Sequence, residues 1–188
     1  MNQLSIFDEQ VIVPGLEYIT EYITMEQEHE LIKVIDSCSW ITELKRRVQH
    51  YGYKYDYKSR IIDPSYYLGL LPKWLQVIAD MLYKQNIFNE IPDQVIINEY
   101  MPRQGIASHV DCIPCFSDTI CSLSLGGSCI IELTNNKVKH PIMLKPRSLL
   151  VFKNEARYEW KHGIIPRKSD NKIIRNRRIS LTFRKVIL

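Results

Sequence analysis

The chain has 188 residues, 45% of them hydrophobic and 24% charged, and this ordinary balance excludes a disordered or fibrous protein. The length suits one compact domain, and no apolar run reaches the roughly 18 to 20 residues that a membrane-spanning helix needs. The start, MNQLSIFDEQ, lacks the basic and apolar regions of a signal peptide, so we expect a cytosolic protein, or a nuclear one in a eukaryote.

The net charge of +4 is unevenly distributed along the chain. Residues 1–136 hold 10 basic and 18 acidic residues, a balance of −8, whereas residues 137–188 hold 15 basic and 3 acidic residues, a balance of +12. The basic segment 137–188 is either a solvated face with a surface loop or a binding surface for nucleic acid. The five cysteines form an odd set of low density, which fits a reducing compartment.

Two helices are predicted in the first half of the chain. Thr24 precedes Gln27 by three residues, which is the spacing of a capping box, and an apolar helical face follows. The second helix is predicted over PKWLQVIADMLYKQ, with Pro72 at its first position. Its buried stripe would consist of Trp74, Leu75, Ile78, Ala79 and Leu82. We interpret both helices as packing elements.

After about residue 93 the pattern changes to short runs rich in β-branched residues. These runs are QVIINEY, TICSLSLG, CIIELT, PIMLKP, SLLVF, RYEWKHG and RRISLTFRKVIL. Strands at this spacing predict a β-sandwich or jelly roll covered by helices on one side, which is an α+β fold. We expect one domain over 1–188, with a helical and lid region over about 1–93 and a jelly-roll core over about 94–188. The basic stretch IPRKSDNKIIRNR is predicted to be a loop.

Two of these runs carry polar residues on one face. In the last run, the two-residue period of a strand places four polar side chains together, and they are Arg178, Ser180, Thr182 and Arg184. Buried arginines need anionic partners, so a small dianion between the sheets would suit this face. Taken alone, the run favours a simpler interpretation, an edge strand with both arginines in water. Asn98 and Tyr100 share a face of QVIINEY, where polar residues often only mark the exit to a loop.

Three residues carry the pattern of a metal site: His109 and Asp111 in ASHVDCI, and His162 in EWKHG. Two histidines and one carboxylate form the facial triad that holds non-haem Fe(II) and leaves positions open for substrate and O2. A single H-x-D motif is weak evidence for a metal site, because a chain with five histidines can contain one by chance. The distal histidine about 50 residues later, with an arginine about 16 residues beyond it, makes the pattern far more specific.

The ordered set NEYMPRQGIASHVD, SLSLGG, YEWKHG and RRISLTFRKV resembles the AlkB family of Fe(II)/2-oxoglutarate-dependent dioxygenases. That family has the pattern N-x-Y, H-x-D, a distal H and R-x-x-x-x-x-R, and the resemblance covers about residues 94–186. RRVQHYGYKYDY is similar to the substrate-lid region, so the likeness spans most of the chain. Within the family, these sequence motifs are most similar to those in the oxygenase domain of the eukaryotic tRNA wobble-uridine hydroxylases.

The resemblance implies that His109, Asp111 and His162 bind Fe(II), with 2-oxoglutarate and O2 as co-substrates. The implied reaction converts 2-oxoglutarate and O2 into succinate and CO2 while a C–H bond of the substrate is hydroxylated. On an N-methyl group the product then breaks down to formaldehyde and the free base.

The resemblance also implies how 2-oxoglutarate is held. Arg178 and Tyr100 would bind its distal carboxylate, and Asn98 and Arg184 would lie near its keto-acid end. Ser180 stands where several DNA-repair members have an asparagine that touches the co-substrate, so one hydrogen bond would be weaker or mediated by water.

The position of Ile113 bears on the substrate. Repair members resemble one another in placing an acidic residue there, two residues after the metal aspartate, to bind the exocyclic amine of a flipped base. Isoleucine cannot accept that hydrogen bond. We therefore expect a modified or alkylated nucleobase, in RNA and especially tRNA ahead of DNA. The alternatives are hydroxylation of a protein or small molecule, or a non-catalytic binding module. We expect a monomer with no membrane association and leave room for an accessory protein.

A run of tyrosines precedes these motifs. In a strand they would share one face and, with Arg46 and Arg47, could form a stacking and phosphate-binding lid. The tyrosines are Tyr51, Tyr53, Tyr55 and Tyr57. A hairpin whose aromatic face belongs to the core is an equal alternative. We also count Trp160, two residues before the distal histidine, among the candidate substrate contacts.

Cys112 and Cys115 form a C-x-x-C motif beside Asp111. A single pair is a weak zinc signal, so we interpret them as ordinary loop thiols, with a metal or redox role as the alternative. The remaining histidines, His29, His50 and His140, are assigned to the surface or to packing.

Overall fold

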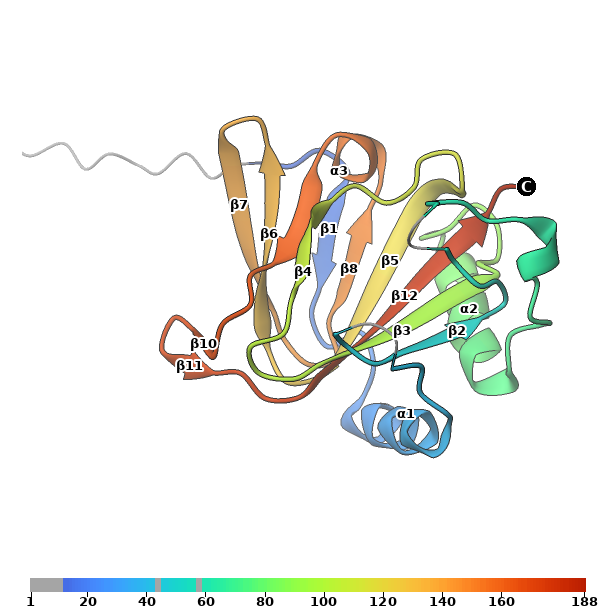
Figure 1. Ribbon diagram of the computed structural model, residues 1–188, viewed down its shortest axis with the longest axis horizontal. Helices are drawn as coiled ribbons and strands as arrows, with labels where there is room; N and C mark the ends of the chain where they lie inside the picture. Colours follow the sequence, from blue (N-terminus) through green and yellow to red (C-terminus); the bar gives the residue numbers. More distant parts are fainter. Residues whose placement is uncertain (1–11, 43–44, 57–58) are drawn as a thin grey trace, which may run out of the picture.

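The computed structural model describes residues 12–42, 45–56 and 59–188. Its strands form two antiparallel sheets that face each other (Figure 1). The major sheet has the order β1 (Leu16–Ile19), β8 (Leu149–Phe152), β5 (Phe116–Gly126), β12 (Arg178–Val186), β3 (Gln94–Tyr100) and β2 (Val48–Tyr51). The minor sheet has the order β4 (Ile106–His109), β9 (Lys161–Ile164), β6 (Cys129–Asn135) and β7 (Val138–Leu144). The region before residue 94 thus supplies two strands, β1 and β2, as well as the helices.

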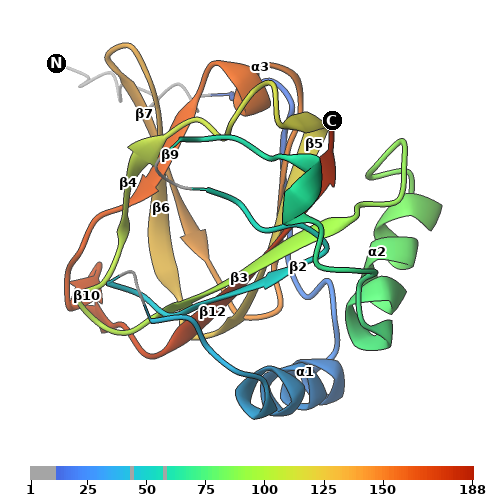
Figure 2. The same ribbon diagram turned by 45° about the vertical axis from the view of Figure 1, so that its right-hand side comes forward.

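The two long helices, α1 (Met25–Ser37) and α2 (Lys73–Lys84), cover the outer face of the major sheet (Figure 2). The capping box of α1 is confirmed, because Thr24 Oγ1 accepts from the Gln27 backbone N–H while Gln27 Oε1 accepts from the Thr24 N–H. Pro72 is the N-cap of α2 rather than its first residue. No helix within the described ranges is long and apolar enough to cross a membrane.

Two buried clusters hold these layers together. The first joins both helices to the major sheet and includes Ile35, Leu75, Leu82, Ile97, Leu123 and Leu181. The second lies between the sheets and includes Leu133, Leu144, Leu150, Phe152 and Trp160. Because alternate residues of the major-sheet strands point to opposite faces, one face packs against the helices while the other looks into the space between the sheets.

Two predicted elements are corrected by the structure. The run RYEWKHG is a strand only in its second half, because its first residues belong to the short helix α3 (Asn154–Tyr158). In α3 the buried Arg157 donates to the backbone carbonyls of Asp111 and Cys112, and this tertiary contact outweighs the strand propensity of the aromatic residues.

The stretch IPRKSDNKIIRNR is a hairpin rather than a plain loop. It forms β10 (Ser169–Asp170) and β11 (Ile173–Ile174). Asp170 is 2% exposed and accepts hydrogen bonds from Arg167, from Arg175 and from the Ile130 backbone N–H. A short η1 turn, Pro64–Tyr66, completes the elements of the described residues.

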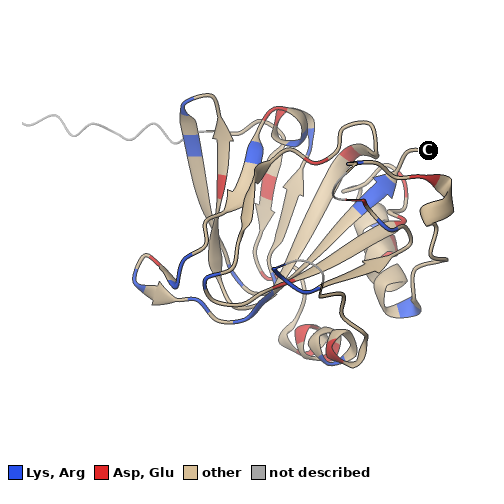
Figure 3. Cartoon of the chain, viewed as in Figure 1, with Lys and Arg blue, Asp and Glu red and all other residues tan. Residues whose placement is uncertain are grey.

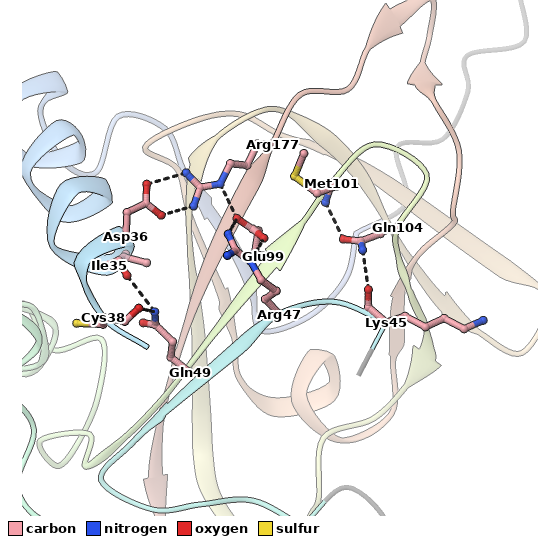
Figure 4. Close-up of polar contacts among 10 residues, drawn as sticks. All are labelled: Ile35, Asp36, Cys38, Lys45, Arg47, Gln49, Glu99, Met101, Gln104 and Arg177. Atoms are coloured by element: carbon pink, nitrogen blue, oxygen red, sulfur yellow. Dashed lines mark hydrogen bonds and ion pairs between the residues drawn. The ribbon is translucent and has the colours of Figure 1, made fainter. Parts of the chain in front are cut away.

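An ionic network fastens α1 and the segment before β2 to the outer face of β3 (Figure 4). Glu99, 4% exposed, accepts from Arg47 Nε at 2.6 Å and from Arg177 Nε at 2.6 Å, and Arg177 also pairs with Asp36 of α1. Nearby, Gln49 Nε2 donates to the Ile35 carbonyl at 3.0 Å. Arg47 and Arg177 together outweigh the effect of burial and hold the pKa of Glu99 below its usual value.

Replacing Glu99 with glutamine should lower the free energy of unfolding by about 2 to 3 kcal/mol, because two guanidiniums then lose their shared carboxylate. Urea unfolding at pH 7 measures this, with Asp36→Asn as the control. The side chain of Asp36 is 42% exposed, so its loss should cost at most about 1 kcal/mol. Equal losses in the two variants would contradict the central role of Glu99.

Candidate active site

The three candidate metal ligands converge at the edge of the minor sheet. β4 and β9 pair so that His109 lies directly opposite His162, and Asp111 follows two residues after the end of β4. One ligand atom from each of the three residues lies within 4.8 Å of the other two. His109 is thus the last residue of β4, whereas Asp111 belongs to the loop beyond it.

The protonation of these side chains fits a bound cation. His109 Nδ1 lies 2.8 Å from the Ala107 carbonyl, so in the neutral ring this nitrogen carries the proton and Nε2 offers a lone pair. That Nε2 lies 3.3 Å from Asp111 Oδ1. Asp111 is 8% exposed, and Arg184 Nε donates to its other oxygen at 2.9 Å. Two lone-pair nitrogens and a carboxylate facing one point suit a divalent cation such as Fe(II).

The charges around the triad keep it in its metal-binding form. Burial alone would raise the pKa of Asp111, but Arg184 and the two histidines outweigh it and hold that pKa well below its usual range. Burial lowers the pKa of His162 to about 4, although Asp111 acts in the opposite direction. At neutral pH the site therefore presents an anionic carboxylate and a neutral His162, which bind a metal without first losing protons.

The low pKa of His162 predicts that the metal-free protein loses stability in mild acid. Below pH 6.5 the unfolded chain binds a proton that folded His162 accepts only near pH 4, so stability falls as the pH drops through this window, by about 2 kcal/mol at pH 5. Urea unfolding of the metal-free protein at pH 7 and pH 5 measures the loss. Burial also lowers the pKa of His50 to about 4, so the loss has a second source. His162→Gln separates the two: it should lose less than wild type, and equal losses would remove His162 from the explanation.

All five residues predicted to hold 2-oxoglutarate line one cavity of about 70 Å³, together with the three metal ligands. This inner cavity lies between the sheets and receives the polar faces of β3 and β12. The five residues are Asn98, Tyr100, Arg178, Ser180 and Arg184. The interpretation of an edge strand with arginines in water is wrong, because β12 lies between β5 and β3, and Arg178 and Arg184 are 2% and 9% exposed.

Arg178 has the surroundings expected of an anion-binding group. Its Nη2 donates to Ser124 Oγ at 2.8 Å, its guanidinium lies 5.6 Å from the centre of the Tyr100 ring, and its buried Nε has no hydrogen-bond partner. Among the described residues, no aspartate or glutamate pairs with it. A buried guanidinium without a carboxylate is costly, so this end of the inner cavity fits the distal carboxylate of 2-oxoglutarate.

The other predicted co-substrate residues have partners within the protein. Asn98 Oδ1 accepts from Arg46 Nε at 2.7 Å, and Ser180 Oγ lies 2.8 Å from Ser122 Oγ. Arg184 is paired with Asp111, so it positions a metal ligand as well as lining the cavity. Ser122 and Ser124 were not predicted from the sequence. They alternate with leucines in β5, and that alternation is the signal that could have revealed them.

An outer cavity of about 280 Å³ adjoins the same metal ligands. Its lining includes His109 and Asp111, with Tyr55, Arg46 and Arg60 among the other residues. Arg60 was not predicted from the sequence, and it donates from Nη2 to the Val110 carbonyl at 2.9 Å. Arg46, predicted as a substrate contact, does lie at this cavity.

Apart from Tyr55, which lines the outer cavity, the other candidate substrate contacts lie elsewhere. Arg47 belongs to the ionic network on Glu99, and Trp160 is 6% exposed within the core between the sheets. The tyrosines do not share one face, because β2 ends at Tyr51 and the chain turns at Gly52, where φ is +77°. Their neighbours differ: the Tyr51 ring packs on Trp74, Tyr53 on Tyr67 and Tyr55 on Phe116. Tyr57 lies outside the described residues.

The loop after Asp111 also differs from expectation. Cys112 and Cys115 form a disulfide rather than two free thiols. Ile113, between them, is 51% exposed.

The comparisons with known proteins agree with this geometry. The family model described as the 2OG-Fe(II) oxygenase superfamily matches residues 15–184. The chain belongs to this superfamily. It is an Fe(II)- and 2-oxoglutarate-dependent dioxygenase of the AlkB type, and His109, Asp111 and His162 lie together as the His-Asp-His facial triad of such enzymes requires. When bound, iron and 2-oxoglutarate supply the oxidation of a C–H bond by O2.

Three relatives match this oxygenase over most of its length. An uncharacterized protein of Acanthamoeba polyphaga mimivirus is 38% identical over 183 residues, which are 92% of this chain and 85% of that protein. The alkylated DNA repair protein ALKBH8 homolog of Arabidopsis thaliana is 35% identical, covering 97% of this chain and 61% of that protein. The tRNA (carboxymethyluridine(34)-5-O)-methyltransferase ALKBH8 of Mus musculus is 38% identical, covering 86% of this chain but only 26% of that protein.

A solved structure supports the fold of this oxygenase. The structure of OsALKBH1 matches with a TM-score of 0.73 at 17% identity, covering 94% of this chain and 99% of that one. The prediction of an α+β fold with a double-stranded β-helix core and helices on one sheet is confirmed.

Proposed function

We propose that this oxygenase hydroxylates or demethylates a modified nucleobase in RNA, with tRNA ahead of DNA. The observation that carries the proposal is the charge of the outer cavity. Three guanidiniums line it, those of Arg46, Arg60 and Arg184, whereas Asp111 is its one carboxylate among the described residues and is taken up by the metal and Arg184. Such a cavity favours a neutral or anionic base with a phosphate nearby.

The same charge argues against repair of 1-methyladenine and 3-methylcytosine. Those bases are cationic, and the lining offers no free carboxylate to compensate their charge. Ile113 supplies none either. A modified uridine, neutral or carrying a carboxylate, fits better. The names of the mouse and Arabidopsis relatives refer to tRNA and to alkylated DNA respectively, and the cavity favours the first.

The basic C-terminal quarter contributes less to this surface than its charge suggested. Four of its fifteen basic residues are buried: Arg157, Arg175, Arg178 and Arg184. Others pair with carboxylates, and the remaining lysines are spread over β7, β9, the β10–β11 hairpin and the segments on either side of β8 (Figure 3). We therefore place the main phosphate contacts at Arg46 and Arg60, beside the cavity, with the lysines as a diffuse attraction.

We assign the remaining roles as follows. Arg178 and Tyr100 bind the distal carboxylate of 2-oxoglutarate, Asn98 and Ser180 line its path to the metal, and Tyr55 supplies an aromatic face at the outer cavity. The protein works as one domain and as a monomer, with room for an accessory protein, in the cytosol or a nucleus. Oxidation of a protein or small molecule is the competing function.

The test is succinate formation from 2-oxoglutarate with Fe(II) under air, alone and with total tRNA, methylated DNA or peptides. We expect tRNA to stimulate turnover severalfold and rising salt to reduce the stimulation. Stimulation by DNA carrying 1-methyladenine would contradict the charge argument, and stimulation by peptides alone would favour the competing function.

Two neighbouring arginines give a matched pair for the same assay. Arg46→Gln should raise the KM for RNA by about tenfold, because a charge-assisted contact is worth about 1.5 kcal/mol. Arg47→Gln, which changes the outer face instead, should leave that KM unchanged. Equal effects of the two variants would remove Arg46 from the substrate site.

A further inference from the structure

The disulfide Cys112–Cys115 lies beside the metal site. Cys112 follows the metal ligand Asp111 directly and lines the outer cavity together with Asp111 and His109, whereas Cys115 is not among the lining residues. Both cysteines are 5% exposed. The disulfide is therefore joined, through Cys112, to the lining of the cavity that contains two of the metal ligands.

Hydrogen bonds hold the backbone of this loop in addition to the disulfide. Arg157, 2% exposed, donates to the carbonyls of Asp111 at 3.1 Å and Cys112 at 3.0 Å. The Cys115 carbonyl accepts from the Ile187 backbone N–H at 3.0 Å. With the backbone held in this way, the two Cα atoms stay near their separation of 5.4 Å, which suits a disulfide, when the bond is reduced.

The surroundings suit the reduced form as well. The Arg60 carbonyl oxygen lies 3.2 Å from Cys112 Sγ and 3.5 Å from Cys115 Sγ, so it can accept hydrogen bonds from both thiols. Apolar side chains cover the pair on the other sides, and they are Tyr53, Tyr55, Ile62, Phe116 and Val186. The side on which Cys112 borders the outer cavity is therefore the side from which small molecules would approach the pair.

We propose that the reduced pair consumes the oxidising equivalent of uncoupled turnover and so protects the enzyme when no substrate is oxidised. Decarboxylation of 2-oxoglutarate then leaves one oxygen atom of O2 unused. The Cys112 and Cys115 thiols supply two electrons and two protons, the S–S bond forms, and the oxygen atom leaves as water. The balance is 2-oxoglutarate + O2 + protein dithiol → succinate + CO2 + H2O + protein disulfide. A dithiol reductant restores the thiols by exchange.

The test starts from reduced, iron-loaded enzyme with 2-oxoglutarate and no nucleic acid, to which O2 is admitted. Alkylation and mass spectrometry measure the Cys112–Cys115 disulfide, and succinate is measured in parallel. We expect one disulfide per succinate in the first turnover. Disulfide formation at the same rate without 2-oxoglutarate, or in Asp111→Ala, would overturn the proposal in favour of oxidation by air. Because no nucleic acid is present, failure of the proposed substrate class leaves this result unaffected.

Variants with one cysteine replaced test which of the two sulfur atoms reacts first. In Cys115→Ser the Cys112 thiol lacks its partner, so it should stop at the sulfenic acid, with one added oxygen atom that dimedone traps. In Cys112→Ser the shielded Cys115 should stay reduced. Cys38→Ser, a change at the end of α1, should behave as wild type, and a thermal unfolding scan confirms that each variant folds. Equal oxidation of Cys112 and Cys115 in the two variants would overturn the assignment of Cys112 as the sulfur that reacts first.

Discussion

Replacing Asp111 with alanine should abolish iron binding and reduce succinate formation by at least about 100-fold. The variant keeps two histidines but loses the only anionic ligand, and the Arg184 cation, which now lacks its partner, opposes the metal. Iron content after reconstitution and gel filtration, measured beside succinate, gives both quantities.

The control for this prediction is Asp118→Ala, which removes an exposed carboxylate of β5. Its iron content and turnover should equal those of wild type. Wild-type iron content in Asp111→Ala would contradict the facial triad. A variant that keeps iron but makes no succinate would leave Asp111 with a role in the reaction rather than in binding.

The second large effect is expected for Arg178→Met. This change removes the buried guanidinium that we assign to the distal carboxylate, at a cost of about 3 kcal/mol in binding, so the KM for 2-oxoglutarate should rise by roughly 150-fold. At the same time the protein free of 2-oxoglutarate should become no less stable and even somewhat more stable, because Arg178 has no carboxylate partner there. Initial rates against 2-oxoglutarate concentration and a urea titration measure the two effects.

Arg177→Met provides the matched control, since the same substitution one residue earlier falls on the opposite face. It should lower stability through the loss of the ion pairs with Glu99 and Asp36, while the KM for 2-oxoglutarate stays near the wild-type value. If both variants changed stability alone, Arg178 would not bind the co-substrate.

The sequence could predict those parts of the site that lie on regular strands. Because side chains alternate strictly along a strand, the polar sets on β3 and β12 followed from spacing alone, and the facing histidines followed from the family pattern. The burial of Arg178 and Arg184 could not be predicted, because it depends on the order of the strands in the sheet. No single stretch of sequence contains that order.

Residues between strands could not be placed in the same way. Arg46 and Arg47 differ by one position and yet reach the cavity and the outer face respectively, and that choice depends on contacts with Asn98 and Glu99. The tyrosine run had the alternation of a strand, but the turn at Gly52 broke it: a Cβ there would lie 1.8 Å from the Asp93 carbonyl oxygen. The net charge of residues 137–188 could likewise be counted from the sequence, whereas the burial of four of their arginines depends on the fold.

The two strands that carry the co-substrate residues also carry the ionic network on their other face. Asn98 and Glu99 are neighbours, as are Arg177 and Arg178, and Arg178 lies opposite Tyr100 in the β3–β12 pairing. Inserting or deleting one residue in either strand would exchange the two faces, turning Arg178 toward α1 and a leucine or isoleucine toward the metal. Length changes in this protein and its relatives should therefore collect in turns such as those between β6 and β7 or β10 and β11, and spare β3 and β12.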